Sequence, residues 1–267
     1  MKFSPVLIST LLASSAISAP LTEKRRARNV ARLLSDRRSN RPFKPDTQEV
    51  LQLNKTSHEQ YSSNWAGAVL IGSGYTSVTG EFVVPKPSVP SGGSSGGQYC
   101  ASAWVGIDGD TCSSAILQTG IDFCAQGSSV SFEAWYEWYP DSSYNFDNFG
   151  VSVGDNIRVT VDASSKTSGT ATVENVSTGQ KVSHTFNGNV AGNLCETNAE
   201  WIVEDFESSG SLVQFADFGT VTFTGAKAST GGSSVGPSGA TIMDIKQNNQ
   251  VFTSSSVSGD EVTVKYV

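Results

Sequence analysis

Histidine is scarce in this 267-residue chain, which has only His58 and His184. A Ser-His-Asp or Cys-His hydrolase needs a histidine beside its nucleophile, and a zinc hydrolase usually needs two or more. His184 lies in a run with ordinary strand alternation, so we interpret it as a structural or solvent-facing side chain. This scarcity disfavours nucleophile–histidine chemistry and zinc chemistry.

Several catalytic motifs are also missing. No GxSxG elbow, P-loop or dinucleotide-binding fingerprint follows a predicted strand. The Asp-Thr/Ser-Gly signature of aspartic proteases is absent as well, and Gln118-Thr119-Gly120 stands in a similar frame with an amide in place of the carboxyl. We therefore expect any chemistry to rest on carboxylates and amides, with no cofactor and no metal.

Long apolar runs are absent too. The run Val6–Ala13 follows a lysine at position 2 and precedes small residues that end at Ser18, which is typical of a secretory signal peptide. It is too short to span a bilayer, and no other stretch approaches the ~18 apolar residues that a membrane helix needs. We predict a signal peptide over residues 1–18 and a secreted, extracellular product with no membrane partner.

Lysine and arginine become rare after residue 60. Residues 61–267 have seven of them against twenty Asp and Glu, a net charge of −13, whereas residues 20–60 have ten against five, a net charge of +5. A basic segment can be a nucleic-acid or membrane arm. Because this one lies between a signal peptide and an acidic domain, we predict a propeptide over residues 19–60 that docks by charge and inhibits the domain, with no nucleic-acid partner.

The remaining domain, residues 61–267, has no convincing apolar stripe of helical period. Short alternating runs rich in Ser, Thr, Gly and Val recur roughly every ten residues. Examples are AGAVLIG, TGEFVVP, NIRVTVDAS, GTATVENVS, KVSHTF, SLVQFADFGTVTFTGA and DEVTVKYV. This pattern predicts an all-β domain, an antiparallel two-sheet β-sandwich or jelly roll, with loops at Ser88–Gln98 and Thr230–Gly239. Nothing in it suggests more than a monomer.

The cysteine content fits export. The four cysteines are Cys100, Cys112, Cys124 and Cys195. An even set in an exported domain predicts two disulfides, with three pairings open, and no CxxC spacing favours a metal. Asn175, in Asn-Val-Ser near a predicted turn, is the only glycosylation sequon of the domain.

A glutamate lies between two large apolar residues in AEWIVEDFE. As a strand, this stretch puts Ile202, Glu204 and Phe206 on one face and Trp201 with Val203 on the other. A carboxylate held between such neighbours has a raised pKa and is a candidate acid or base. The alternative is a paired structural glutamate or a strand-edge charge.

The same alternation recurs in SAWVGID, ILQTGIDF and FEAWYEWY, where an apolar face backs a polar and aromatic one. The polar and aromatic face carries Trp104, Asp108, Gln118, Asp122, Glu133, Trp135, Glu137 and Tyr139. A sheet with such a second face can line a cleft. The alternative is a solvated outer face with scattered aromatics, which the tryptophans disfavour.

Long stretches of the domain resemble the fungal glutamic peptidases, the eqolisin family. They are YSSNWAGAVL, CASAWVGIDGDTC, AILQTGIDFC, AWYEWYPD and LCETNAEWIVEDFES. The resemblance implies a concanavalin-like sandwich of two seven-stranded antiparallel sheets, with the active site on the concave face of one sheet. It also implies the pairs Cys112–Cys195 and Cys100–Cys124.

The resemblance further implies a secreted acid endopeptidase acting on proteins and peptides and insensitive to pepstatin. Its catalytic glutamate and glutamine match Glu204 and Gln118. Its substrate-cleft and supporting residues match Trp104, Asp108, Asp122, Trp135, Glu137 and Tyr139. Some members lose a basic linker before the first cysteine and become two chains, but Pro85–Gln98 has only Lys86, so we expect a single-chain mature enzyme.

These groups suffice for peptide hydrolysis without a nucleophile or metal. Glu204 would deprotonate water and later protonate the leaving nitrogen, while Gln118 would orient the water and stabilise the oxyanion. An amide is neutral at any pH and so works in acid. Two other readings remain at this point: a retaining glycosidase with Glu137 and Glu204 about 5–5.5 Å apart, or a carbohydrate-binding jelly roll without catalysis.

Overall fold

The structure is a computed structural model that describes residues 38–45 and 59–267. The predicted signal peptide and most of the predicted propeptide lie outside these residues, as does His58. The described chain contains β-strands and no α-helix, as the missing helical stripe predicts. Nothing in this part of the chain could therefore cross a membrane as a helix.

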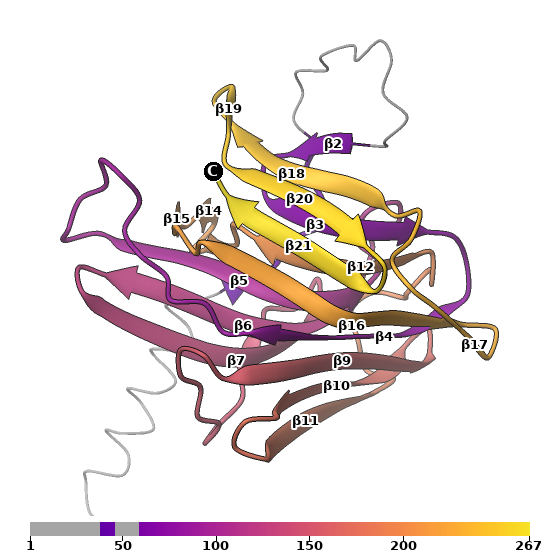
Figure 1. Ribbon diagram of the computed structural model, residues 1–267. Helices are drawn as coiled ribbons and strands as arrows, with labels where there is room; N and C mark the ends of the chain where they lie inside the picture. The colour runs from indigo at the N-terminus through magenta and orange to yellow at the C-terminus, as the bar shows by residue number, and fades with distance from the viewer. Residues whose placement is uncertain (1–37, 46–58) are drawn as a thin grey trace, which may run out of the picture. The chain divides into compact units, whose positions relative to one another are not determined.

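One large sheet of the described chain has eight strands, in the order β11-β10-β9-β4-β16-β21-β20 with β17 beside β16 (Figure 1). The strands are β4 (Tyr75–Val83), β9 (Asn156–Ser165), β10 (Ser168–Asn175), β11 (Gln180–Asn187), β16 (Thr220–Thr230), β17 (Ser233–Val235), β20 (Thr253–Ser258) and β21 (Glu261–Tyr266). Every pairing in this sheet is antiparallel. We call it the eight-stranded sheet.

The other large sheet has ten strands, in the order β19-β18-β3-β12-β5-β6-β7-β8, with β15 beside β5 and β2 beside β18. The strands are β2 (Glu59–Ser62), β3 (Trp65–Ile71), β5 (Gln98–Ile107), β6 (Ile116–Gln126), β7 (Ser129–Tyr139), β8 (Tyr144–Asn145), β12 (Asn198–Glu204), β15 (Gln214–Phe215), β18 (Thr241–Gln247) and β19 (Gln250–Val251). Its pairings are antiparallel except for β15 with β5 and β2 with β18. We call it the ten-stranded sheet.

A third, small sheet joins the described part of the predicted propeptide to the domain. It consists of β1 (Arg38–Ser39), β13 (Glu207–Ser208) and β14 (Ser211–Leu212). In the β1–β13 pair, Arg38 lies opposite Ser208 and Ser39 opposite Glu207. The backbone of residues 38 and 39 is therefore extended and hydrogen-bonded just beyond the end of β12.

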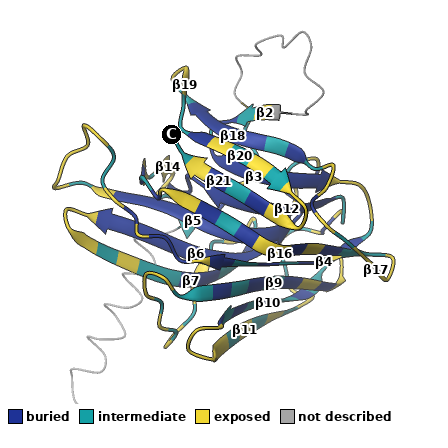
Figure 2. Ribbon diagram, viewed as in Figure 1, coloured by how far each residue is buried: buried dark blue, intermediate teal, exposed yellow. Residues whose placement is uncertain are grey.

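The core lies between the two large sheets. Each central strand of the ten-stranded sheet sends alternate side chains into it, for example Ala103, Val105 and Ile107 from β5 and Trp201 from β12. Phe82 and Phe223 meet them from the eight-stranded sheet with their rings edge to face. Figure 2 shows β5, β6 and β12 as the most deeply buried strands.

The two-sheet β-sandwich predicted from the alternation is confirmed, and two details differ. The sheets have eight and ten strands in the described chain rather than the seven each that the family resemblance implies, because the short strand β17 extends the first and short strands such as β8 and β19 extend the second. The run SLVQFADFGTVTFTGA is not one strand but falls in β14, β15 and β16, which belong to three sheets. A period-two pattern continues through such breaks, so it cannot mark them.

The described chain has two disulfides, Cys100–Cys124 and Cys112–Cys195, and no free cysteine. This is the pairing that the family resemblance implies. Cys100 and Cys124 lie directly opposite each other on β5 and β6. Cys112 and Cys195 join the loop after β5 to the loop before β12, 83 residues apart in sequence, and so tie together two segments that lead into the site.

Asn175, the predicted glycosylation site, is completely buried. Its Nδ2 atom, which would carry the sugar, donates hydrogen bonds to Gly150 O at 3.1 Å and to Asp155 Oδ2 at 2.8 Å. Its Oδ1 atom accepts from the backbone N–H of Thr178, so the side chain closes the turn between β10 and β11. This placement counts against the predicted glycan and gives Asn175 a structural role.

Candidate active site

The outer face of the ten-stranded sheet, which points away from the core, carries most of the predicted site residues. We call it the site face. The strand register sets its side chains in three rows that cross β12, β5, β6 and β7. The rows are Glu200–Gly106–Gln118–Glu137, Ile202–Trp104–Gly120–Trp135 and Glu204–Ser102–Asp122–Glu133. Gln118 and Glu204 thus come from strands with β5 between them and flank the middle row.

Gly120 makes room for the middle row. A Cβ atom at this position would lie 2.5 Å from the Cβ of Trp104 and 2.3 Å from Ala103 O. Because Gly120 has no Cβ atom, the Trp104 indole can lie buried between the two outer rows, where its Nε1 donates to Glu204 Oε2 at 2.9 Å. The glycine therefore allows the contact that orients Glu204.

Glu204 ends β12 and is 1% exposed. Its Oε1 accepts from Asn64 Nδ2 at 3.3 Å, and its Oε2 is the acceptor for Trp104. Burial, followed by the charge of Glu137, raises the pKa of Glu204 well above its ordinary value, although the two hydrogen bonds act in the opposite direction. Glu204 is therefore a buried carboxyl that holds its proton more tightly than a solvated one.

Gln118 lies on β6 and is completely buried. Its Nε2 donates to the main-chain carbonyl oxygen of Asn40 at 2.7 Å and to Glu137 Oε2 at 3.2 Å. Its Oε1 has no hydrogen-bond partner among the described residues. The amide thus presents its NH₂ group to a peptide carbonyl.

Glu137 and Asp122 flank Gln118 on the site face. Glu137 accepts from the Ser39 hydroxyl and from the Asn40 backbone N–H, both at 3.0 Å, yet burial outweighs these bonds and raises its pKa well above the ordinary value. Burial likewise raises the pKa of Asp122 to about 6, against the opposing charge of Arg38. The site face therefore collects several carboxyls that favour their neutral form.

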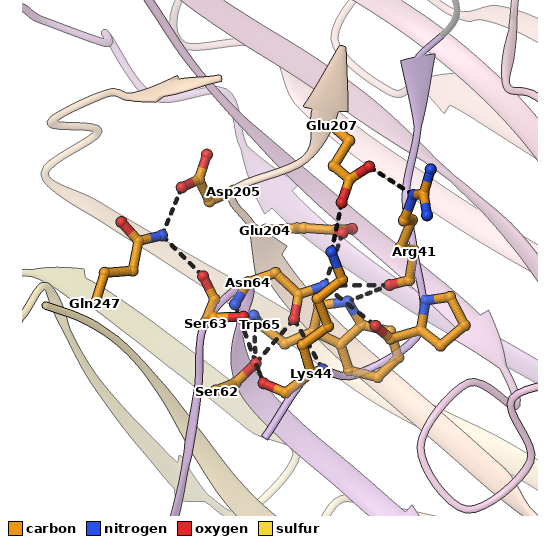
Figure 3. A network of polar contacts seen from close by, with 11 residues as sticks. Arg41, Lys44, Ser62, Ser63, Asn64, Trp65, Glu204, Asp205, Glu207 and Gln247 are labelled. Atoms are coloured by element: carbon orange, nitrogen blue, oxygen red, sulfur yellow. Dashed lines mark hydrogen bonds and ion pairs between the residues drawn. The ribbon is translucent and has the colours of Figure 1, made fainter. Parts of the chain in front are cut away.

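Residues 38–45 of the predicted propeptide lie across this face. Arg38 Nη1 pairs with Asp122 at 3.0 Å and with Glu133 at 2.6 Å. At the other end, Arg41 and Lys44 both pair with Glu207 (Figure 3). All three basic side chains thus meet carboxylates, as charge docking predicts.

Main-chain and ring contacts hold the middle of the same segment. Trp65 Nε1 donates to Arg41 O at 3.0 Å, and Asn64 Nδ2 reaches Arg41 O and Pro42 O at 3.3 Å each (Figure 3). Asn64 Nδ2 also donates to Glu204. The peptide bonds of Arg41 and Pro42, which follow Asn40, therefore lie close to the predicted catalytic glutamate. Phe43 packs against the Trp65 ring, with the ring centroids 6.3 Å apart.

The other predicted residues have supporting positions. Trp135 donates from Nε1 to the Ser102 hydroxyl at 3.0 Å, and Tyr139 packs at the edge of the Trp65–Trp104 cluster. Asp108 has a left-handed φ of 71° and lies beyond the end of β5. Its carboxylate accepts hydrogen bonds from the backbone N–H groups of residues 195–198, so it fixes the loop before β12 instead of facing Gln118.

The described residues include one cluster of potential metal ligands, formed by Asp108, Cys112 and Cys195. Both sulfurs are in a disulfide, and the Asp108 oxygens are occupied by backbone N–H groups. The cluster therefore offers no thiolate to a metal. His184 lies on β11 of the eight-stranded sheet, where its ring stacks on Tyr136 at 4.1 Å. Tyr136 alternates with Trp135 and Glu137 along β7, so this stack lies on the side of β7 that faces away from the site face.

Three polar residues of this region were not assigned a role from the sequence. Asn64 and Glu207 contact the segment across the site, and their part depends on long-range packing. Glu200 could have been found, because the alternation that marks Glu204 also places Glu200 on the site face.

Comparisons with known proteins agree with this fold. Aspergillopepsin-2 of Aspergillus niger is 62% identical over 282 residues, which cover all of both chains. Scytalido-glutamic peptidase, solved with a transition state analog inhibitor, matches with a TM-score of 0.71 and 45% identity over 77% of this chain and 98% of that one. Aspergilloglutamic peptidase from Aspergillus niger matches with a TM-score of 0.62 and 69% identity over 63% and 99%.

The described chain is thus a β-sandwich with a buried carboxyl, Glu204, and a buried amide, Gln118, on the outer face of one sheet. Residues 63–266 match the Peptidase A4 family. The chain belongs to this family and is a glutamic peptidase, as the eqolisins are. The resemblance seen in the sequence is confirmed, and the family membership favours a peptide hydrolase over the glycosidase and lectin readings.

Proposed function

We propose that this protein is a secreted acid endopeptidase in which Glu204 and Gln118 hydrolyse peptide bonds in proteins. One observation carries the proposal. Gln118 Nε2 lies 2.7 Å from a main-chain carbonyl oxygen, that of Asn40, in a region where Glu204 is also buried. A donor at this distance from a peptide carbonyl is what an oxyanion site requires.

The reaction follows from these two groups. Glu204 accepts a proton from a water molecule, whose oxygen attacks the carbonyl carbon of the substrate. The carbonyl oxygen becomes negative and is stabilised by Gln118 Nε2. When the C–N bond breaks, Glu204 returns the proton to the leaving nitrogen, so that acid and amine products form and the enzyme is regenerated.

The raised pKa of Glu204 belongs to the covered state, in which residues 38–45 lie over the site face. Burial is the first cause of that shift. Departure of the segment would admit water, lower the pKa of Glu204 and leave a fraction of it ionised in acid, which a base needs. Uncovering the site would thus supply both the reacting water and the base.

We further propose that residues 19–60 form a propeptide that inhibits the enzyme until it is acidified. The support is the position of residues 38–45, whose cations pair with Asp122, Glu133 and Glu207 while the Asn40 carbonyl occupies the Gln118 donor. These carboxylates lose charge in acid, whereas Arg and Lys keep theirs. Secretion, a signal peptide over residues 1–18 and a monomeric mature enzyme complete the proposal.

The test is a comparison of two assays on the acid-treated full chain. We expect release of acid-soluble peptides from a denatured protein at pH 3 and no release of reducing sugar from polysaccharides. Peptide release should resist pepstatin. Sugar release without peptide release would overturn the proposal and restore the glycosidase reading, while binding of polysaccharide without either product would favour a lectin.

A further inference from the structure

Glu200 is a buried carboxyl that the proposed reaction does not use. It lies in the middle of β12, is completely buried, and neither of its oxygens has a hydrogen-bond partner among the described residues. A buried polar group without a partner costs about 1–3 kcal/mol, and an ionised one costs more. Such a residue in the site face calls for a functional explanation.

Glu200 faces Gln118 across a glycine. Glu200 pairs with Gly106, and Gly106 pairs with Gln118, so the two side chains stand on the same face with one strand between them. A Cβ atom at Gly106 would lie 2.8 Å from Glu200 Oε1, 2.9 Å from Cζ3 of the Trp104 ring and 3.3 Å from the Cβ of Gln118. Two strand spacings separate the backbones by roughly 10 Å, a span that a glutamate and a glutamine can reach across together. The two side chains make no hydrogen bond to each other while residues 38–45 cover the site face.

The hydrogen-bonding atoms on the two sides are complementary. Gln118 Oε1 is a buried acceptor without a donor among the described residues, while its Nε2 already serves Asn40 and Glu137. A neutral carboxyl has one O–H donor, but an ionised carboxylate has acceptors only. The neutral form of Glu200 can therefore satisfy Gln118 Oε1, and the ionised form would repel it.

We propose that Glu200 is a positioning residue whose protonated carboxyl holds the Gln118 amide with Nε2 towards the substrate carbonyl. This inference rests on the proposed role of Gln118 as oxyanion donor. If Glu200 ionises, the favoured orientation of the amide reverses and presents Oε1 to the substrate oxygen, so the donor is lost. Glu200 would thereby link the pH of the medium to the orientation of a catalytic group that does not itself titrate.

The surroundings of Glu200 keep it neutral. Its paired neighbours on β3 and β5, Val69 and Gly106, carry no charge. Burial raises the pKa of Glu200 well above its ordinary value, and the nearby charges of Asp108 and Asp110 act in the same direction. Glu204 on the same strand and Glu137 beyond Gln118 are also acidic. Glu200 is thus protonated in acid and ionises only at higher pH.

The test compares Glu200→Gln with Glu200→Leu, in full chains activated by acid. Glutamine keeps a donor at every pH, so kcat at pH 3 should stay within about twofold of wild type and the high-pH limb of the kcat profile should move upward by about half a pH unit or more. Leucine removes the donor, so kcat at pH 3 should fall at least about tenfold with little change in KM. Glu261→Gln, on the surface of the eight-stranded sheet, is the matched control and should leave the profile unchanged.

Circular dichroism at each pH restricts the comparison to folded protein. Should Glu200→Leu fail to fold, the pH profile of Glu200→Gln decides alone. A profile identical to wild type in Glu200→Gln, or an undiminished kcat in folded Glu200→Leu, would overturn the positioning role. Wild type and Glu204→Gln are run in the same assay, so failure of the dyad itself would appear there and be distinguished from failure of the Glu200 inference.

Discussion

The two large sheets treat their carboxyl groups in opposite ways. On the eight-stranded sheet, burial alone would raise the pKa of Glu81, but hydrogen bonds from Arg158 and Asn156 outweigh it and lower the pKa. On the ten-stranded sheet, Glu200 and Glu204 have raised pKa values because no cation within the sheet offsets their burial. In the eight-stranded sheet Glu81 is thus an ionised partner of a cation, whereas in the ten-stranded sheet Glu200 and Glu204 are buried carboxyls that favour the neutral form.

This difference means that the carboxyls which destabilise the fold when they ionise lie mainly in the ten-stranded sheet, beside the proposed site. Buried carboxyls stabilise a fold in acid and destabilise it where they must ionise. Within the described chain, the cations that pair with Asp122, Glu133 and Glu207 are Arg38, Arg41 and Lys44, and all three come from the predicted propeptide. Removal of that segment would leave the acidic site without these cations, which suits the proposed activity in acid.

The largest difference between the two sheets should appear in activity, when side chains of each sheet are replaced. Glu204→Gln keeps the shape and removes the proposed base, and Gln118→Ala removes the proposed oxyanion donor, so each should lower kcat by about a thousandfold or more in a folded protein. The double variant should be little worse than either single one, because in the proposed mechanism both groups act in one transition state. Glu81→Gln on the eight-stranded sheet is the control and should keep wild-type kcat.

Peptide release at pH 3, with folding verified by circular dichroism, measures this prediction. If Glu204→Gln retained a tenth of wild-type turnover, the base would have to be another carboxyl of the site face, such as Glu137 or Asp122.

The next largest effect should be on stability as a function of pH. Burial raises the pKa of Asp205 from 3.8 to about 7, and each pKa unit corresponds to about 1.4 kcal/mol, so Asp205 contributes up to ~4 kcal/mol. Because the folded-state pKa is the higher one, this contribution is complete below pH 3.8 and is lost as pH rises to about 7. Asp122, with a pKa of about 6, acts in the same direction.

Urea unfolding of the mature domain should therefore show a lower free energy of unfolding at pH 7.5 than at pH 3.5. Asp205→Asn should reduce that difference, since asparagine cannot ionise and its Oδ1 can still accept the hydrogen bond from Gln247 Nε2. A domain more stable at pH 8 than at pH 3 would contradict this account of the buried carboxyls.

A feature of the fold or the site can be predicted from the sequence when it depends only on local backbone geometry. Period-two alternation places Trp104, Gln118 and Glu204 on one face, since it needs only the strand geometry, and the register agrees. It fails at Asp108, where a left-handed φ of 71° takes the side chain out of the alternation. The sequon at Asn175 is equally local, but burial of that side chain is a tertiary property.

Contacts between distant segments lie beyond the sequence pattern. Arg38 meets Asp122 across 84 residues, and the pairing of Arg41 with Glu207 depends on β1 joining β13. Charge composition predicts that the propeptide and the domain attract, but not which carboxylates are used. The pairing of the four cysteines also stayed open on the residues alone, because it requires the register of β5 with β6.

A smaller effect is expected for the contact between the propeptide and the site face. A peptide of residues 20–60 should inhibit the mature domain at pH 5–6, less at pH 3, and less again in 1 M salt, where the Debye length falls to about 3 Å. Glu207→Gln should weaken this inhibition about three- to tenfold at pH 5–6, because Glu207 pairs with both Arg41 and Lys44.

Inhibition constants across pH and salt measure this contact. An inhibition insensitive to both variables would mean that apolar contacts dominate. The candidates are Phe43 on Trp65 and the apolar runs Val30–Leu34 and Val50–Leu53, which lie outside the described residues.

The smallest effect should come from the eight-stranded sheet and should have the opposite dependence on pH. Arg158 pairs with Glu81 and Glu174 on a surface that is partly open to solvent, and such pairs contribute about 0–1 kcal/mol. Since the pKa of Glu81 is lowered in the folded state, the contribution is present at pH 7 and is lost as the carboxylates take up protons in acid. Arg158→Met should therefore lower the free energy of unfolding by less than about 1 kcal/mol at pH 7 and by less still at pH 2.5. Urea titrations at the two pH values measure this decrease. A larger decrease in the free energy of unfolding at pH 2.5 than at pH 7 would mean that the two sheets do not differ in the way their carboxyl groups respond to pH.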